Sequence, residues 1–129
     1  MRQDVQTVNA AATIGALREI FPLSSTAYVI AVDEARRYVG LISVADAHAA
    51  EATPDDPIKD FLHYRDDMLL PGMAVKEAVL AFDRAEAEAL AVVDSFTNRR
   101  VIGLLTEAYV LRRYAAALEG RRRDLVGED

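Results

Sequence analysis

The feature that most constrains the fold of this chain is an internal repeat, in which the second half follows the order of the first. When the first half is shifted by about 61 positions, apolar residues fall on apolar residues and Asp33 falls on Asp94. After a turn that is slightly longer in the second copy, Gly40 falls on Gly103 and Ser43 falls on Thr106. An aspartate, a glycine and a hydroxyl residue in the same order are hard to match by chance, so the sequence predicts a duplication. The same shift aligns Ile14 with Val75, Leu17 with Ala78, Phe21 with Phe82 and Val32 with Val93.

The first copy predicts the element order β-α-β-β-α. An extended stretch over residues 5–8 is followed by a helix that Thr13 can cap. Two β-prone runs, over residues 27–32 and 38–42, flank a polar turn and predict a hairpin. Ser43 can cap the short helix that closes the copy. The apolar stripe of the first helix, which we expect to be buried, consists of Ile14, Leu17, Ile20 and Phe21.

The second copy predicts the same order. A short strand over residues 68–70 precedes a helix, and two further strands are expected over residues 90–93 and 101–105. Thr106 can cap the last helix. The expected boundaries are residues 1–50 for the first repeat, 51–57 for a linker, 58–118 for the second repeat and 119–129 for a charged C-terminal tail.

One copy alone is too small to bury a stable core, so we expect the pair to be the folding unit. The predicted fold class is therefore α/β, with two repeats related by a pseudo-twofold axis and each small sheet covering the other. Apolar residues left on the helix faces would pack between two pairs and predict a homodimer. The residues expected there are Ile14, Leu17, Val75 and Val79.

Composition excludes several classes of function. The chain has no cysteine, which rules out disulfides, thiolate catalysis and thiol metal ligands. Its formal net charge of −6 disfavours nucleic acid as a partner. No apolar run reaches the roughly 18 residues that would span a membrane, so we expect the fragment itself to be soluble.

No motif predicts catalysis or a metal site. His48 and His63 are the only histidines, and neither has an obvious nucleophile or paired carboxylate beside it. We therefore expect that the chain is not an enzyme, binds no metal and requires no cofactor. The basic clusters Arg112-Arg113 and 121–123 are typical of a solvated helix end, and contact with anionic lipid headgroups is the alternative.

The repeated motifs resemble those of the cystathionine-β-synthase-type (CBS) module. The first copy carries Ala31-Val32-Asp33 at a strand end, Val39-Gly40-Leu41-Ile42 in the next strand and Ser43-Val44-Ala45-Asp46 at the start of a helix. The second copy carries Val92-Val93-Asp94, Ile102-Gly103-Leu104-Leu105 and Thr106-Glu107-Ala108-Tyr109. The resemblance covers almost the whole chain and implies a CBS-domain pair.

The stretch over residues 101–114 is similar to the closing stretch of the CBS pair that follows the membrane domain in chloride channels and chloride–proton antiporters. This resemblance implies a regulatory and dimerisation module on the cytoplasmic side of a membrane, with the membrane transport domain of a parent protein as its partner. The alternative is a free-standing CBS pair that senses a nucleotide and acts on a partner in trans.

The CBS resemblance also implies a ligand site at Asp46. In that family the aspartate of Ser/Thr-x-x-Asp accepts hydrogen bonds from a ribose, and Ser43 with Asp46 preserves the arrangement. A purely structural role explains the same pair, because the serine caps the helix and the aspartate suits its first turn. Tyr109 replaces the aspartate in the second copy, so only one of the two expected clefts keeps the acceptor.

The packing of the family implies that Asp46 faces Leu70, Glu86 and Ala87 of the second copy. Leu70 would cover an adenine ring, whereas Glu86 would repel phosphates. The expected nucleotide-binding residues are therefore Ser43, Asp46, Leu70 and Ala87. The expected ligand is an adenine nucleotide or adenosine, and adenosine fits the charges better than the triphosphate does.

Overall fold

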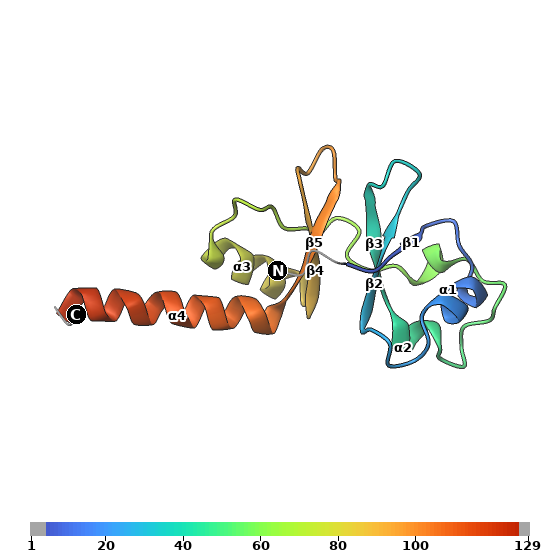
Figure 1. The fold of residues 1–129 in the computed structure, drawn as a ribbon, viewed down its shortest axis with the longest axis horizontal. Coiled ribbons are helices and arrows are strands. Elements are labelled where there is room, and N and C mark those ends of the chain that lie inside the picture. The colour runs from blue at the N-terminus through green and yellow to red at the C-terminus, as the bar shows by residue number, and fades with distance from the viewer. Residues whose placement is uncertain (1–4, 127–129) are drawn as a thin grey trace.

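The computed structural model describes residues 5–126 and consists of two similar halves placed side by side (Figure 1). The first half contains β1 (Thr7–Asn9), α1 (Ile14–Ile20), β2 (Tyr28–Val32), β3 (Tyr38–Ser43) and α2 (Val44–Ala47). The 3-10 helix η1 (Ile58–Phe61) follows the linker. The second half contains α3 (Val75–Ala85), β4 (Ala89–Val93), β5 (Val101–Thr106) and α4 (Glu107–Val126).

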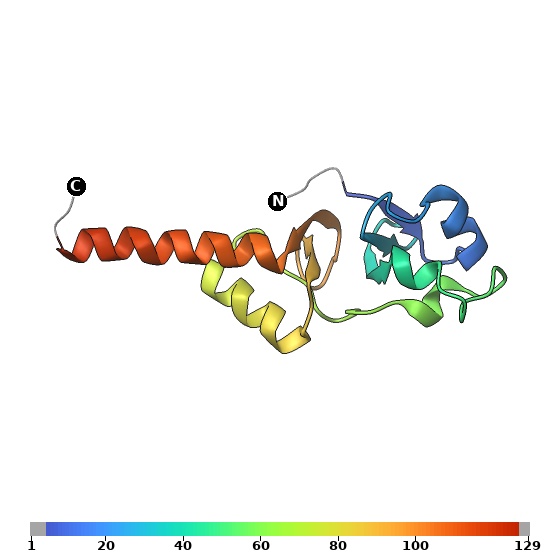
Figure 2. The ribbon, with the colours of Figure 1, turned by 90° about the horizontal axis from the view of Figure 1, so that it is seen from below.

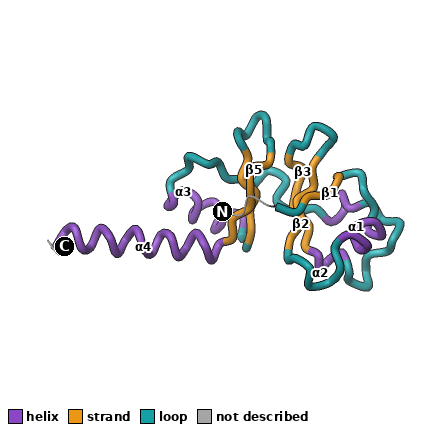
Figure 3. The backbone as a smooth tube through the Cα atoms, in the orientation of Figure 1, coloured by secondary structure: helices purple, strands orange, loops and turns teal. Residues whose placement is uncertain are grey.

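The strands form two small sheets in the middle of the molecule, and the helices lie on the outer sides (Figure 3). One sheet has the order β1-β2-β3, and the other pairs β4 with β5. In the antiparallel hairpins, Tyr28 lies opposite Ser43 and Ala89 lies opposite Thr106. These are equivalent positions of the two copies, and both hairpins have a register irregularity before the last residue of the first strand. The structure therefore confirms the predicted duplication.

The opening strand of the second copy is shorter than predicted. In the first copy β1 pairs in parallel with β2, and the N–H of Ala10 extends the pairing by donating to the Val32 carbonyl at 2.8 Å. In the second copy only Leu69 forms a bridge, with Val92, so the strand predicted over residues 68–70 is reduced to a single parallel bridge. The equivalent of Ala10 is Pro71, which has no N–H to donate, and the pairing ends there.

The predicted helix caps are present in all three places. The hydroxyl of Thr13 accepts a hydrogen bond from the N–H of Ala16, that of Ser43 from Asp46, and that of Thr106 from Tyr109. These bonds satisfy N–H groups that have no partner within the helix. The predicted stripe of α1 is partly wrong, because Ile20 is 61% exposed.

The apolar core has three parts. One cluster lies inside the first half around Ile14 and Leu17, and one lies inside the second half around Phe82 and Leu90. The third joins the halves, because side chains from both sheets meet between them, as predicted. Its buried members include Ile30, Val32 and Leu41 from the first half and Met68, Ala89, Ala91 and Val93 from the second.

The two hairpin turns also meet across the pseudo-twofold axis. Arg37 and Arg100, which occupy equivalent positions, form an antiparallel bridge with each other, and the N–H of Tyr38 donates to the Arg99 carbonyl at 2.7 Å. The residues before the bridge, Arg36 and Arg99, both have left-handed backbones, with φ of 63° and 61°. Backbone pairing and side-chain packing thus join the halves into one unit.

Two of the residues expected at a dimer surface lie in the interior. Ile14 and Leu17 are fully buried in the first-half cluster, because the linker after α2 covers α1. The linker holds this position through hydrogen bonds from Ile14 N–H to the Asp56 carbonyl and from Ile58 N–H to the Ala12 carbonyl. Val75 and Val79 are partly buried against the second-half cluster.

The last helix is the longest element. Figure 2 shows α4 running past α3 and away from the two sheets, and it continues through Val126 into the residues expected to form a tail. Within residues 5–126, no helix combines the length and the apolar character required to cross a membrane.

Candidate functional site

A hollow lies where the two halves meet beside the start of α2, and we call it the Asp46 hollow. Its volume is about 340 Å³. Strands β2 and β3, helix α2, the segment after η1 and the loop between α3 and β4 all contribute to its wall. The lining residues are Tyr28, Leu41, Ser43, Asp46, His63, Tyr64, Glu86 and Glu88.

The structure brings Ser43 and Asp46 together at this hollow. The Ser43 hydroxyl accepts from the backbone N–H of Asp46 at 3.4 Å, which fixes the start of α2. The Asp46 side chain is 58% exposed, and its Oδ2 lies 4.0 Å from Nε2 of His63. A carboxylate held at a helix start and open to solvent is able to accept hydrogen bonds from a ligand.

The charge of the hollow is negative. Asp46, Glu86 and Glu88 all line it, and none of its described lining residues is Lys or Arg. The hydroxyl of Tyr28 donates to Oε2 of Glu88 at 3.3 Å. Burial raises the pKa of Tyr28, and the negative charge of Glu88 beside it raises that pKa further. This field favours neutral or cationic ligands and repels phosphate groups.

Two of the predicted site residues do not reach the hollow. Leu70 lines a different cavity, described below. Ala87 is 2% exposed and packs in the second-half cluster. The neighbouring Glu86 ends α3 with a left-handed backbone (φ 52°), and its side chain lines the hollow. The chain therefore presents Glu86 to the hollow while Ala87 enters the core.

Sequence reasoning missed five lining residues, Tyr28, Leu41, His63, Tyr64 and Glu88. Tyr28 was accessible to prediction, because it pairs with Ser43 across the expected hairpin. His63 was not, because it reaches β3 through backbone bonds with Leu41 in both directions, at 2.8 and 2.9 Å. Such pairing between the segment after η1 and a strand leaves no sequence pattern.

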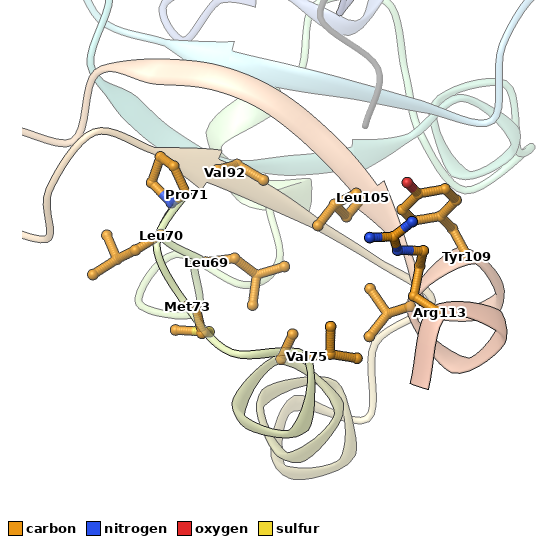
Figure 4. Close-up of a pocket in the computed structure, with 11 residues that line it drawn as sticks. Leu69, Leu70, Pro71, Met73, Val75, Val92, Leu105, Tyr109 and Arg113 are labelled. Atoms are coloured by element: carbon orange, nitrogen blue, oxygen red, sulfur yellow. The ribbon is translucent and has the colours of Figure 1, made fainter. Parts of the chain in front are cut away.

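A second cavity lies within the second half, and we call it the second-repeat cavity. Its volume is about 250 Å³. Figure 4 shows Leu69, Leu70, Pro71 and Met73 on one side of it and Leu105, Tyr109 and Arg113 on the other. The remaining lining residues are Val75, Ala78, Val92 and Val110. Its wall is mainly apolar, and Tyr109, in the place of the missing aspartate, contributes a phenol.

The described residues offer no metal site. No group of three or more histidine, cysteine, aspartate or glutamate side chains is placed to hold an ion in this part of the chain. His48 lies with Nε2 2.8 Å from the Phe21 carbonyl oxygen, and His63 faces Asp46. Both histidines thus have local partners.

Comparison with solved structures shows that the fold is that of a CBS-domain pair. The chain is similar to a CBS domain pair/ACT domain protein from Thermotoga maritima, with 21% identity over 90% of this chain and 93% of that chain and a TM-score of 0.71. It is also similar to a CBS domain pair in complex with 5′-methylthioadenosine and S-adenosyl-L-methionine, with 20% identity over 91% of this chain and 93% of that chain and a TM-score of 0.72.

A third similar structure comes from a transport protein. It is the cytosolic domain of the Mg²⁺ channel MgtE in complex with ATP, with 23% identity over 85% of this chain and 45% of that chain and a TM-score of 0.69. No family model and no curated protein matches the chain. The predicted α/β fold with tandem β-α-β-β-α repeats is thereby confirmed.

Proposed function

We propose that this CBS-type pair is the regulatory and dimerisation module of a chloride-channel-like membrane transport protein, and that an adenine ligand at the Asp46 hollow biases its geometry. The observation that carries the proposal is the place of the hollow, whose wall combines side chains of both repeats. A ligand there would contact both halves at once. The proposal assigns no catalytic step to any residue and requires no cofactor.

Two likenesses support a transport parent. The cytosolic domain of the Mg²⁺ channel MgtE has a similar fold. Residues 101–114 resemble the end of the CBS pair in chloride channels and chloride–proton antiporters. The module would then act at the cytoplasmic side of a membrane, coupled to a transport domain.

The alternative is a free-standing CBS pair that acts on a partner in trans. Sequencing the natural transcript upstream of Met1 separates the two. A series of long apolar segments in frame supports the transport parent, and an in-frame stop codon just upstream supports the alternative.

A ligand regulates such a module only if it prefers one arrangement of the repeats over another. Asp46 from the first repeat and Glu86 with Glu88 from the second face the same space. A neutral nucleoside that hydrogen-bonds to carboxylates of both repeats would favour the arrangement in which the two repeats lie close together around it. Added phosphates would oppose these carboxylates, so we expect adenosine to bind more tightly than AMP, and AMP more tightly than ATP.

Isothermal titration calorimetry of the whole chain with adenosine, AMP, ADP and ATP tests this proposal. We expect heat with adenosine, a loss of affinity of about tenfold or more in Asp46→Ala, and no change in the control Asp83→Ala. Asp83 is an exposed carboxylate on α3 that does not line the hollow. No heat with any of the four compounds would reject the adenine ligand, and unchanged affinity in Asp46→Ala would reject the site.

The variant Glu88→Gln tests whether the negative charge of the Asp46 hollow repels phosphate groups. Glutamine keeps an acceptor for the Tyr28 hydroxyl and removes one negative charge from the hollow. We expect the affinity for AMP to rise relative to that for adenosine. An unchanged ratio would show that the phosphate lies away from Glu88.

The dimerisation part of the proposal rests on apolar side chains that remain exposed on the last helix. Leu111 is 46% exposed and Leu118 is 41% exposed. They are seven residues apart, so they lie on one face of α4, at the spacing that pairs helices. We place the contact between two copies there, together with the predicted Val79 and in place of Ile14, Leu17 and Val75, because Val75 lines the second-repeat cavity.

A further inference from the structure

The second-repeat cavity has no open counterpart in the first repeat, because there the chain fills the equivalent space itself. Ile58 of η1 is fully buried in the same cluster as Val8, Ile14, Leu17 and Ile42. The residues at the equivalent positions of the second repeat all line the cavity, and they are Leu69, Val75, Ala78 and Leu105. The second repeat therefore has the walls of this apolar site without the side chain that occupies it.

The side chains at these positions also leave more room in the second repeat. Leu17 of the first repeat corresponds to Ala78, which is smaller by three carbon atoms. The resulting volume of about 250 Å³ lies below the roughly 300–1,000 Å³ of sites for drug-sized ligands. The cavity is thus of the size of a small metabolite.

A peptide that followed the path of the linker would not fit the second repeat. In the first repeat, a Cβ atom placed on Gly15 would lie 3.1 Å from the Pro54 carbonyl oxygen and 3.2 Å from Pro54 Cβ. The close passage of the linker therefore depends on glycine. The equivalent residue in the second repeat is Lys76, which carries the Cβ atom that such a close passage does not accommodate. A free small molecule has no such restriction.

The charge at the cavity is positive. Arg113 lines it, no carboxylate does so, and no ion pair joins Arg113 to any carboxylate that the structure describes. Tyr109 adds a hydroxyl that can donate. A guanidinium at the rim of an apolar site is a partner for one carboxylate or similar anion.

The geometry points to a binding site for a small organic anion with an apolar body in the second-repeat cavity. The apolar part occupies the space that Ile58 fills in the first repeat, and the anionic group meets Arg113 and Tyr109. This site is separate from the Asp46 hollow and differs from it in sign of charge. Leu111 and Leu118 belong to another face of α4, so a dimer formed through them leaves the cavity accessible.

Titration of the whole chain with sodium octanoate below its micelle concentration tests the site, with octan-1-ol and octylamine as probes of the same body and different charge. We expect octanoate to bind about tenfold or more tightly than either. In an amide NMR spectrum, the shifts should fall on residues such as Leu69, Met73 and Val110. Absence of octanoate binding, equal binding of the alcohol, or shifts confined to the Asp46 hollow would each overturn the proposal.

Two variants and a control sharpen this test. Arg113→Gln should weaken octanoate binding about tenfold or more, whereas Arg112→Gln, on the same turn but outside the cavity, should leave it unchanged. Ala78→Leu places the leucine of the first repeat into the cavity and should abolish binding while the circular dichroism spectrum stays the same. Undiminished binding in Arg113→Gln or in a folded Ala78→Leu protein would contradict the assignment. A second copy covering the cavity would prevent octanoate binding in the wild type, and that result also overturns it.

Discussion

At the scale of single residues, the two equivalent aspartates at the strand ends hold the hairpin turns. The carboxylate of Asp33 accepts from the N–H groups of Ala35 and Arg37, at 2.9 and 2.8 Å. That of Asp94 accepts from the Asn98 amide at 2.6 Å and from the N–H groups of Ser95 and Arg100. Hydrogen bonds to an ionised carboxylate lower its pKa. The pKa of Asp33 is lowered mainly by the hydrogen bond from the Arg37 N–H, and the pKa of Asp94 is lowered mainly by the hydrogen bond from the Asn98 amide.

These lowered pKa values predict an acid-sensitive fold. A carboxyl group whose pKa is lower in the folded state adds stability above its unfolded value of 3.8, and that stability is lost as the pH falls through the folded value. We expect Asp94→Asn to lower the urea midpoint at neutral pH. Between about pH 5 and about pH 2.5, the free energy of unfolding of this variant should fall less than that of the wild type.

The matched control for this experiment is Asp55→Asn. Asp55 is an exposed linker residue whose side chain makes no hydrogen bond with any residue that the structure describes. Its variant should keep the wild-type dependence of stability on pH. Equal pH dependence in Asp94→Asn and the wild type would contradict the role given to the turn.

The turn aspartates and the capping hydroxyl residues were predictable from the sequence because each occurs at equivalent positions in both copies. The alignment of Asp33 with Asp94, and of Ser43 with Thr106, predicted positions that the structure shows in matching roles. The hydrogen-bond partners of the aspartates were not predictable. They depend on the left-handed backbones of Arg36 and Arg99, which are not residues that favour such conformations.

At the scale of elements, the halves diverge in how each first helix is covered. The linker crosses α1 so closely that the N–H of Gly15 donates to the Pro54 carbonyl at 2.9 Å. Nothing in the described part of the chain crosses α3 in this way, and the second-repeat cavity lies open there. One duplicated element thus serves as a packed helix in the first copy and as the wall of a cavity in the second.

The contact between linker and α1 predicts the effect of Gly15→Ala. Alanine favours a helix over glycine by about 1 kcal/mol, but the added Cβ would crowd Pro54, and such crowding typically costs about 1–3 kcal/mol. We expect a net loss of stability in chemical unfolding. The control is Gly120→Ala in α4, where nothing lies within 4 Å of the added Cβ. It should lose no stability, and a Gly15→Ala protein as stable as the wild type would refute the close contact.

Most elements were predictable because their signals are local. The β-prone runs over residues 27–32 and 38–42 predicted the hairpin of β2 and β3, and hydroxyl residues predicted the starts of three helices. The errors arose where a distant contact decides the outcome. Ile20 fits a helical stripe, yet the core contacts Ile14, Leu17 and Phe21 at the i, i+3, i+7 spacing and leaves Ile20 outside.

At the scale of the whole molecule, the two repeats are bound by a core that neither could form alone. The cluster between the sheets takes side chains from both halves, and the hairpin turns bridge at Arg37 and Arg100. The candidate site arises from the same packing, which explains why Ser43, Asp46 and Glu86 were predicted to lie there but most of the remaining wall was not. Glu88 and His63 reach the hollow from the other repeat and from the segment that leads to it.

The exposed face of α4 predicts the state of association in solution. We expect the wild type to sediment as a dimer and Leu111→Glu/Leu118→Glu to sediment as a monomer, because the charges would be buried at the contact. The control is Ala116→Glu, which adds charge to an exposed position on the opposite face of the same helix. A monomeric wild type, or dissociation of the Ala116→Glu protein, would contradict the proposed contact.

The length of α4 has a mechanical consequence. Its 20 residues, at 1.5 Å per residue, make a rod of about 30 Å whose base is fixed to β5 at Thr106. If the second repeat turned by about 5° around the pseudo-twofold contact, the far end of the rod would swing by about 2.6 Å. A displacement of the strands that is itself small would thus be several times larger at the far end of α4, where a protein in contact with that helix would sense it.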